Sequence, residues 1–104
     1  FPTRPLFRSL VETFPHIDWE QQGDYFFSRV IMHGARRSEE MFESARTVRD
    51  AGLAGHMPHA AATQQAWIAS HRATGVFTEP MALKPWRERA DALLNALAAG
   101  KQTA

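Results

Sequence analysis

The sequence lacks cysteine, so it can form neither a disulfide framework nor a zinc site built on thiolates. It also has no apolar run near the roughly 20 residues that a membrane-spanning helix needs. A charge excess is missing too, because twelve basic residues face eleven acidic ones, for a formal net charge of +1. That balance gives no general attraction to nucleic acid or to an anionic membrane. We therefore expect neither nucleic acid nor a membrane as a partner. The lack of cysteine fits a protein of the reducing cytoplasm.

Signatures of catalysis and of ligand binding are also missing. The sequence has no GxSxG around a serine, no glycine-rich loop of the kind that binds dinucleotides or phosphate, and no HExxH. His56 and His59 are three residues apart but straddle Pro58 at a predicted helix start, and a zinc site needs about three converging ligands. We therefore predict no catalytic residue, no cofactor-binding motif and no metal site in this chain.

What the sequence does contain is material for a packed core. Hydrophobic residues make up 44 %, with three Trp and seven Phe among 104 residues, which suits one domain and not two. The chain begins at Phe1 without the features of a secretion signal, so we expect that a further segment precedes it. We treat residues 1–104 as a single all-helical domain or fragment.

The hydrophobic repeat has a period near 3.6 residues almost everywhere, which predicts an all-α fold. Thr3 is expected to cap the first helix, and Pro58 suits the first turn of the third. Gly52, Gly75 and Gly100 are expected to end the last three helices, because glycine readily takes the left-handed conformation of a helix end. The last four residues should fray. The predicted helices are about four in number and span about 5–13, 19–50, 58–72 and 85–99.

The helix predicted over about 19–50 is long for a globular protein. Asp18, followed three residues later by Gln21, forms a capping-box pattern at its start. Gly34 in its middle costs about 1 kcal/mol relative to alanine, so we expect a close approach of another helix there, or a kink. The expected buried stripe consists of Gly23, Phe27, Val30, Gly34, Met41, Ala45 and Val48.

The stretch HGARRSEEM, residues 33–41, places two arginines, a histidine and glutamates on one side of this helix. Arginine suits fork-like binding of a carboxylate or phosphate, and a neighbouring histidine can donate to the same anion. Arg37 should face inward, because it follows Gly34 by three residues and precedes Met41 by four. Arg36 should then be the solvated partner of Glu40. The candidate substrate-binding residues are His33, Arg37, Arg36 and Glu40.

An alternative interpretation of the same face is a salt-bridged surface exposed to water. The arginines of the long helix also do not form a basic stripe for nucleic acid, because Glu39, Glu40 and Glu43 interleave with them. Both the binding face and the solvated face remain open interpretations of HGARRSEEM.

The chain has more large apolar side chains than four helices readily cover. An exposed remainder would mark an interface with a second copy or with a missing N-terminal part. The residues concerned are Trp19, Phe26, Phe27, Phe42, Trp67, Phe77 and Trp86.

The segments DYFFSRVIMHGARRSEEM, ARTVRDAGL and MPHAAATQQAW, within about residues 14–70, resemble the C-terminal helical domain of NAD(P)-dependent oxidoreductases. These oxidoreductases are similar to 6-phosphogluconate dehydrogenase and 3-hydroxyisobutyrate dehydrogenase. The resemblance implies an N-terminal Rossmann domain that binds NAD or NADP, and a helical domain that closes one wall of the substrate cleft and commonly forms a dimer. The family's catalytic lysine has a glycine-rich lead-in that is absent here, so its role does not transfer to Lys84 or Lys101.

The resemblance thus implies the later part of a dehydrogenase C-terminal domain. In an NAD(P)-dependent hydroxy-acid dehydrogenase-like oxidoreductase, this part would line the substrate cleft and form dimer contacts. On its own it would be inactive. Its partners would be a second copy or a Rossmann domain, and a small anionic substrate. The alternative is a free-standing helical dimerisation or interaction module without enzymatic activity. An upstream GxGxxG after a first strand would favour the dehydrogenase.

Overall fold

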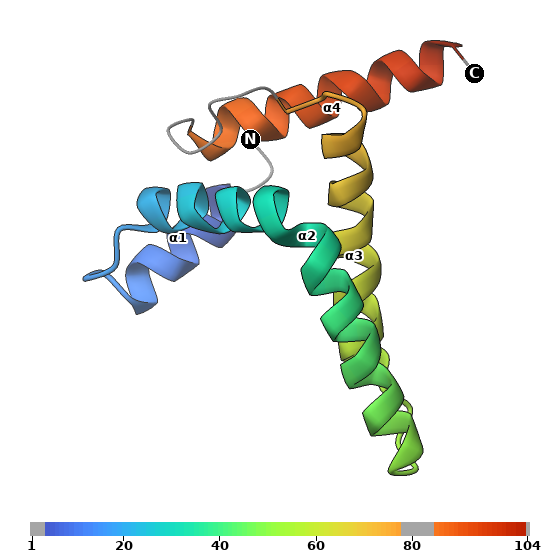
Figure 1. Cartoon of the computed structure of the whole chain (residues 1–104). Helices are drawn as coiled ribbons and strands as arrows, with labels where there is room; N and C mark the ends of the chain where they lie inside the picture. The colour runs from blue at the N-terminus through green and yellow to red at the C-terminus, as the bar shows by residue number, and fades with distance from the viewer. Residues whose placement is uncertain (1–3, 78–84, 104) are drawn as a thin grey trace.

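A computed structural model of the chain describes residues 4–77 and 85–103, in which all regular structure is helical (Figure 1). This confirms the predicted all-α fold and the long helix over 19–50. None of the helices in these two ranges combines the length and apolarity that crossing a membrane requires. The expected cap Thr3 and residues 78–84, between the third and fourth predicted helices, lie outside the described residues. The helices are α1 (Arg4–Thr13), α2 (Trp19–Asp50), α3 (His56–Ala73) and α4 (Trp86–Thr103).

The start and end of α2 follow from its capping residues. The carboxylate of Asp18 accepts the backbone N–H of Gln21 at 3.1 Å, which satisfies one of the free donors of the first turn. Glu20 lies in the same turn, where the helix dipole favours negative charge. At the other end Gly52 has φ +93°, the left-handed conformation expected of it.

Two predicted boundaries differ from the structure. Helix α3 begins at His56, after Gly55 with φ +68°, so Pro58 lies in the first turn but does not open it. Helix α4 continues through Gly100 to Thr103, so the prediction that it ends at Gly100 is wrong. Gly100 has no positive φ, and the strong helix formers before it, Ala98 and Ala99, favour continuation at a glycine cost of about 1 kcal/mol.

Helix α2 bends near its middle, and beyond the bend it runs antiparallel to α3 (Figure 1). We call residues 34–73 the hairpin arm. Small residues line its inner side: Ala45 and Ala62 are both fully buried, with 0 % exposure. A Cβ on Gly34 would lie 2.9 Å from the backbone oxygen of Gln65. The close approach expected at Gly34 is therefore present, and it needs the absence of a side chain.

Three features of residues 32–38 favour the bend. Gly34 lowers the helix propensity at the centre of α2. Ser38 is buried, and its hydroxyl donates to the backbone oxygen of Ala35 at 2.7 Å. Arg72 of α3 donates from Nη1 to the backbone oxygen of Met32 at 2.9 Å. External donors to carbonyls in a helix interior are a recognised cause of bending.

The other part of the molecule, which we call the head, consists of α1, residues 19–33 of α2, and α4. Head and hairpin arm meet at a small core of Ile31 and Ile68, against which Val30, Phe77 and Leu93 pack. Phe77 is therefore one of the large apolar side chains that the chain itself partly covers.

The expected stripe of α2 is only partly buried. Gly34 and Ala45 are buried, whereas the other members are half-buried: Gly23, Phe27, Val30, Met41 and Val48. On α4, Leu94 is 55 % exposed. The hairpin arm is a single pair of helices, so α3 covers only one side of α2, and Met41 lies at the edge of that side. On α4, Leu93 faces the core, and Leu94 is turned about 100° away from it.

Candidate functional site

The candidate residues predicted from HGARRSEEM lie together along one side of α2, at the bend. The Nε of Arg36 is 3.8 Å from Oε1 of Glu40, and the side chains are 63 % and 65 % exposed. This is the solvated pair predicted from their spacing of four residues. At this distance and exposure it contributes about 0.2–0.5 kcal/mol.

Arg37 is half-buried, as its position between Gly34 and Met41 predicts. Its Nε is buried, and among residues 4–77 and 85–103 that atom has no hydrogen-bond partner. A buried N–H group without an acceptor costs about 1–3 kcal/mol. An anion or a polar ligand group at this position would recover that energy.

His33 is half-buried on α2, and positive charges of both α2 and α3 act on it. Partial burial of its imidazole lowers the pKa of His33, and the guanidinium groups of Arg29, Arg36, Arg37 and Arg72 lower it further. The neutral ring is therefore favoured near pH 7. In that form it has one donor and one acceptor nitrogen.

Two of these arginines were not among the predicted site residues. Arg29 lies one helical turn before His33, at the spacing that places side chains on one face, so the sequence held a signal for it. Its guanidinium carbon is 5.9 Å from the centre of the Tyr25 ring. Arg72 comes from α3, and only the folding of the hairpin brings it here. We call Arg29, His33, Arg36, Arg37 and Arg72 the basic cluster.

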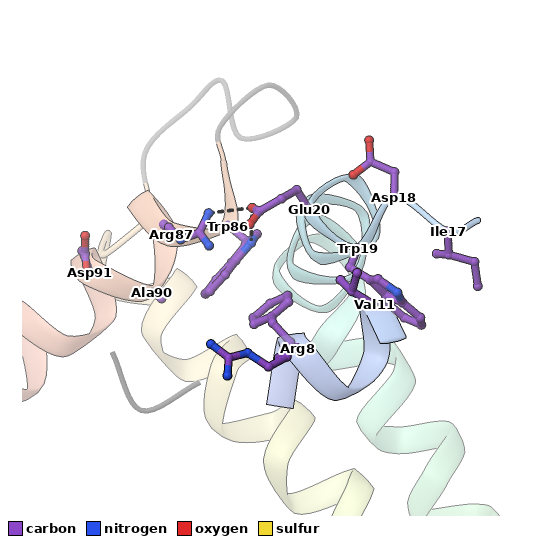
Figure 2. Close-up of a pocket in the computed structure, with 11 residues that line it drawn as sticks. Arg8, Val11, Ile17, Asp18, Trp19, Glu20, Trp86, Arg87, Ala90 and Asp91 are labelled. Atoms are coloured by element: carbon purple, nitrogen blue, oxygen red, sulfur yellow. Dashed lines mark hydrogen bonds and ion pairs between the residues drawn. The ribbon is translucent and has the colours of Figure 1, made fainter. Parts of the chain in front are cut away.

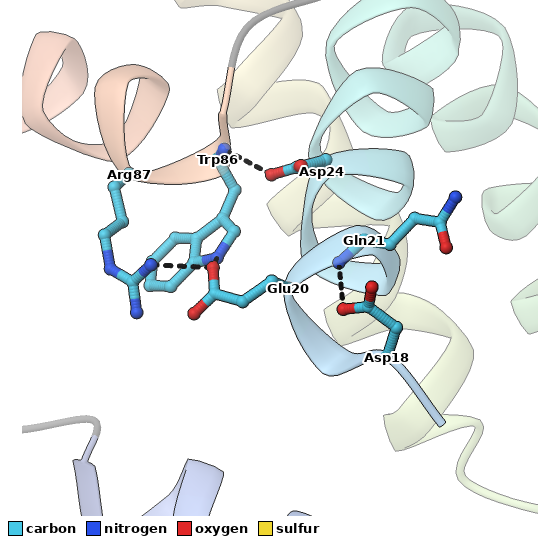
Figure 3. A network of polar contacts seen from close by, with 6 residues as sticks. All are labelled: Asp18, Glu20, Gln21, Asp24, Trp86 and Arg87. Atoms are coloured by element: carbon cyan, nitrogen blue, oxygen red, sulfur yellow. Dashed lines mark hydrogen bonds and ion pairs between the residues drawn. The ribbon is translucent and has the colours of Figure 1, made fainter. Parts of the chain in front are cut away.

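A second polar site fastens α4 to α2 (Figure 3). Trp86 is only 5 % exposed, and its backbone N–H donates to Oδ1 of Asp24 at 2.7 Å. Its indole Nε1 donates to Oε2 of Glu20 at 3.0 Å, and Nη1 of Arg87 donates to the same oxygen at 2.6 Å. The hydrogen bond from Arg87 is the largest of the causes that lower the pKa of Glu20. Asp24 thus caps α4, and Glu20 binds its first turn.

An open hollow of about 1040 Å³ adjoins this network, between α1, the start of α2 and α4 (Figure 2). Glu20 and Arg87 are already paired on its wall, so they contribute to the attachment of α4. The walls combine apolar rings with charges of both signs, which suits an amphipathic segment of protein. The sequence did not indicate that these positions would come together, because α4 lies far from α1 and from the start of α2 along the chain. The lining residues are Phe7, Arg8, Val11, Ile17, Asp18, Trp19, Glu20, Trp86, Arg87, Ala90 and Asp91.

The described parts of the chain bring together no group of three or more His, Cys, Asp or Glu side chains that could hold a metal ion. His59, one of the histidines beside Pro58, instead packs edge-on against Phe42, with 5.5 Å between the ring centres. The basic cluster is therefore the arrangement with the clearest binding chemistry, since it presents several donors and positive charges to an anion.

Comparison with known proteins gives one family match. Residues 3–68 match the family model of a domain of unknown function, DUF1932. The matched segment includes α1, α2 and most of α3, so it contains every member of the basic cluster except Arg72. No curated protein and no solved structure matches the chain.

Proposed function

The chain belongs to the family of the domain of unknown function DUF1932, and from this premise we propose that it is the helical C-terminal part of an NAD(P)-dependent hydroxy-acid dehydrogenase-like oxidoreductase. DUF1932 is a domain found at the C-terminus of 3-hydroxyisobutyrate dehydrogenase-like NAD(P)-dependent oxidoreductases. The match over residues 3–68 is the observation that carries the proposal. NAD or NADP would bind to the Rossmann domain of the intact protein, and the catalytic lysine would lie early in the helical domain, in the long helix that follows the Rossmann domain.

The shape of the chain supports a role as one part of a larger assembly. Its radius of gyration is 16.0 Å, whereas a compact domain of 100 residues has about 13 Å. Large apolar side chains remain exposed on the head and on the hairpin arm, and surfaces of this kind mark interfaces. We propose that the Rossmann domain or a second copy covers them. These side chains include Tyr25, Phe26, Phe42, Leu53, Met57, Trp67 and Leu94.

Within this proposal, the face of His33, Arg36, Arg37 and Glu40 lines the substrate cleft and helps to hold a small anionic substrate. Arg37 is the main candidate, because its Nε is buried without a partner. Arg36 is held by Glu40 and is largely exposed, so it contributes less.

The test uses the intact protein, with its upstream segment, and follows the reduction of NAD and NADP with a panel of small hydroxy acids. Arg37→Ala should raise KM roughly tenfold with little change in kcat, since it removes binding shared by substrate and transition state. Arg36→Ala is the matched control and should leave KM within about twofold. Thermal melts of both variants separate lost binding from lost stability.

Two results would contradict the proposal. An upstream sequence without GxGxxG, in a protein that reduces neither cofactor, would favour the free-standing helical interaction module. Unchanged kinetics and melting temperature in both variants would leave HGARRSEEM as a solvated face of α2.

A further inference from the structure

The basic cluster carries more positive charge than the neighbouring carboxylate of Glu40 neutralises. Arg29 lies two helical turns before the adjacent pair Arg36 and Arg37 on α2, and Arg72 comes from the last turn of α3. Glu40 pairs with Arg36 at 3.8 Å. Within the part of the chain that the structure describes, no carboxylate pairs with Arg29, Arg37 or Arg72.

We propose that the basic cluster binds a small carboxylate-bearing anion between α2 and α3, and that the imidazole of His33 takes up a proton from solvent as the anion binds. The inference deepens the proposed function, on which it rests for the identity of the anion as a substrate group. It adds Arg29 and Arg72 to the site and makes binding depend on pH.

Three observations carry the argument. The buried Nε of Arg37 is a donor without an acceptor. Arg72 joins the two helices through its bond to the backbone oxygen of Met32, so its guanidinium is held beside α2. The positive charge of each of the four arginines opposes protonation of the His33 imidazole. An anion placed here offsets that repulsion and accepts hydrogen bonds from the same groups.

The proton uptake follows from the same charges. The charged groups that act on His33 are three arginines of its own helix and Arg72 of α3, and partial burial adds to their effect in lowering the pKa of His33. A bound carboxylate supplies the missing negative charge, so the pKa of His33 should rise. Because proton uptake and anion binding are linked, the anion should bind more tightly at pH 5.5 than at pH 7.5. Each half unit by which the pKa of His33 rises corresponds to a roughly threefold gain in affinity.

The test is a titration of the full 104-residue chain with sodium malonate, compared with sodium chloride at equal ionic strength. The imidazole resonances are followed by NMR from pH 5 to 8, and His33→Gln assigns the signal of His33. Malonate should raise the pKa of His33, and the imidazole signals of His16 and His59, outside the basic cluster, serve as internal controls. In His33→Gln, malonate should still bind, and between pH 5.5 and 7.5 it should keep only the pH dependence that the second ionisation of malonate itself produces.

Arginine variants show whether the cluster is the site. Arg29→Gln and Arg72→Gln should each weaken malonate binding by roughly three- to tenfold, because each removes a charge-assisted donor at a partly solvated site. Arg46→Gln is the matched control, since Arg46 also lies on α2 but pairs with Glu43 at 3.1 Å outside the cluster. Circular dichroism verifies that each variant is folded. If Arg72→Gln unfolds, the comparison of Arg29→Gln with Arg46→Gln still tests the site.

The inference is overturned if malonate acts no differently from chloride, or if Arg29→Gln binds malonate as Arg46→Gln does. Its failure is distinguishable from that of the proposed function. Malonate binding in this chain, with unchanged substrate kinetics for Arg37→Ala in the intact protein, would keep the anion site and reject its role in the substrate cleft. The reverse result would reject proton-coupled binding and keep the substrate role.

Discussion

The hairpin arm and the head are held together by different means. In the hairpin arm, small residues allow two backbones to approach, so that a Cβ on Gly34 would lie 2.9 Å from the Gln65 oxygen and one on Gly55 would lie 3.1 Å from the Ala45 oxygen. In the head, a single large residue is the centre of the contacts. Trp86 stacks on Phe7 with 5.3 Å between ring centres.

The two regions also differ in how far apart their contacts lie in the sequence. The hairpin arm is a continuous segment closed by the short turn of residues 51–55, so its contacts form with little loop closure. In the head, Trp86 bonds to Glu20 across 66 residues. The hairpin arm is therefore sensitive to added volume, whereas the head is sensitive to the loss of one side chain.

Trp86→Ala is the largest test of this difference. It removes a 5 % exposed indole that also packs on Phe27 at 5.8 Å between ring centres. The free energy of unfolding should fall by about 3–5 kcal/mol in urea denaturation. Trp86→Phe keeps a ring in the stack but loses the bond to Glu20, so it should cost less. A loss below about 1 kcal/mol for Trp86→Ala would show that the head does not depend on Trp86.

Gly34→Ala tests the hairpin arm. Alanine improves helix propensity by about 1 kcal/mol, but the new Cβ meets a backbone oxygen that cannot move freely. The clash should exceed the gain, with a net loss of about 1–2 kcal/mol. Gly100→Ala is the matched control, since nothing lies within 4 Å of its Cβ position, and it should stabilise α4 by about 0.5–1 kcal/mol. Equal effects at both glycines would contradict the close approach.

The long helix α2 and the turn that follows it were largely predictable from sequence because their determinants are local. The cap at Asp18, the left-handed Gly52 and the small residue at Gly34 each act within a few residues of their position. The Arg36–Glu40 pair and the half-buried Arg37 likewise follow from helical spacing. The same local reasoning was wrong at Gly100. This glycine was expected to end α4, but the helix continues through it to Thr103.

The contacts between distant segments could not be read in the same way. Nothing near Trp86 in the sequence indicates that its N–H and indole bond to Asp24 and Glu20 of α2. Arg72 joins the basic cluster only because the turn of the hairpin sets which residues of α3 face the bend. Helical periodicity predicts the face on which a residue lies, but not the helix that this face meets.

The stability of the head should depend on pH through the carboxylate of Glu20. Because its pKa is lowered from 4.5 in the folded state, its contribution is present above pH 4.5 and is lost as the pH falls through the lower, folded value. The side chain is 54 % exposed, so we expect only about 0.5–1 kcal/mol after solvent screening. Glu20→Gln should flatten the stability profile between pH 3 and 6. Glu12→Gln, on the exposed side of α1, is the control and should follow wild type.

The smallest expected effect compares one ion pair from each region by double-mutant cycles. Arg36 and Glu40 of the hairpin arm are 3.8 Å apart, so their coupling should be about 0.2–0.5 kcal/mol. Arg87 and Glu20 of the head are 2.6 Å apart and share Trp86 as a second donor, so their coupling should approach about 1 kcal/mol. Both pairs are exposed, and both couplings should shrink in 1 M NaCl, where the screening length is about 3 Å. Equal couplings in low salt would mean that the shorter distance in the head adds nothing. The head would then depend on the packing of Trp86 and on its hydrogen bond to Asp24, and the pair of Arg87 with Glu20 would serve only to orient α4.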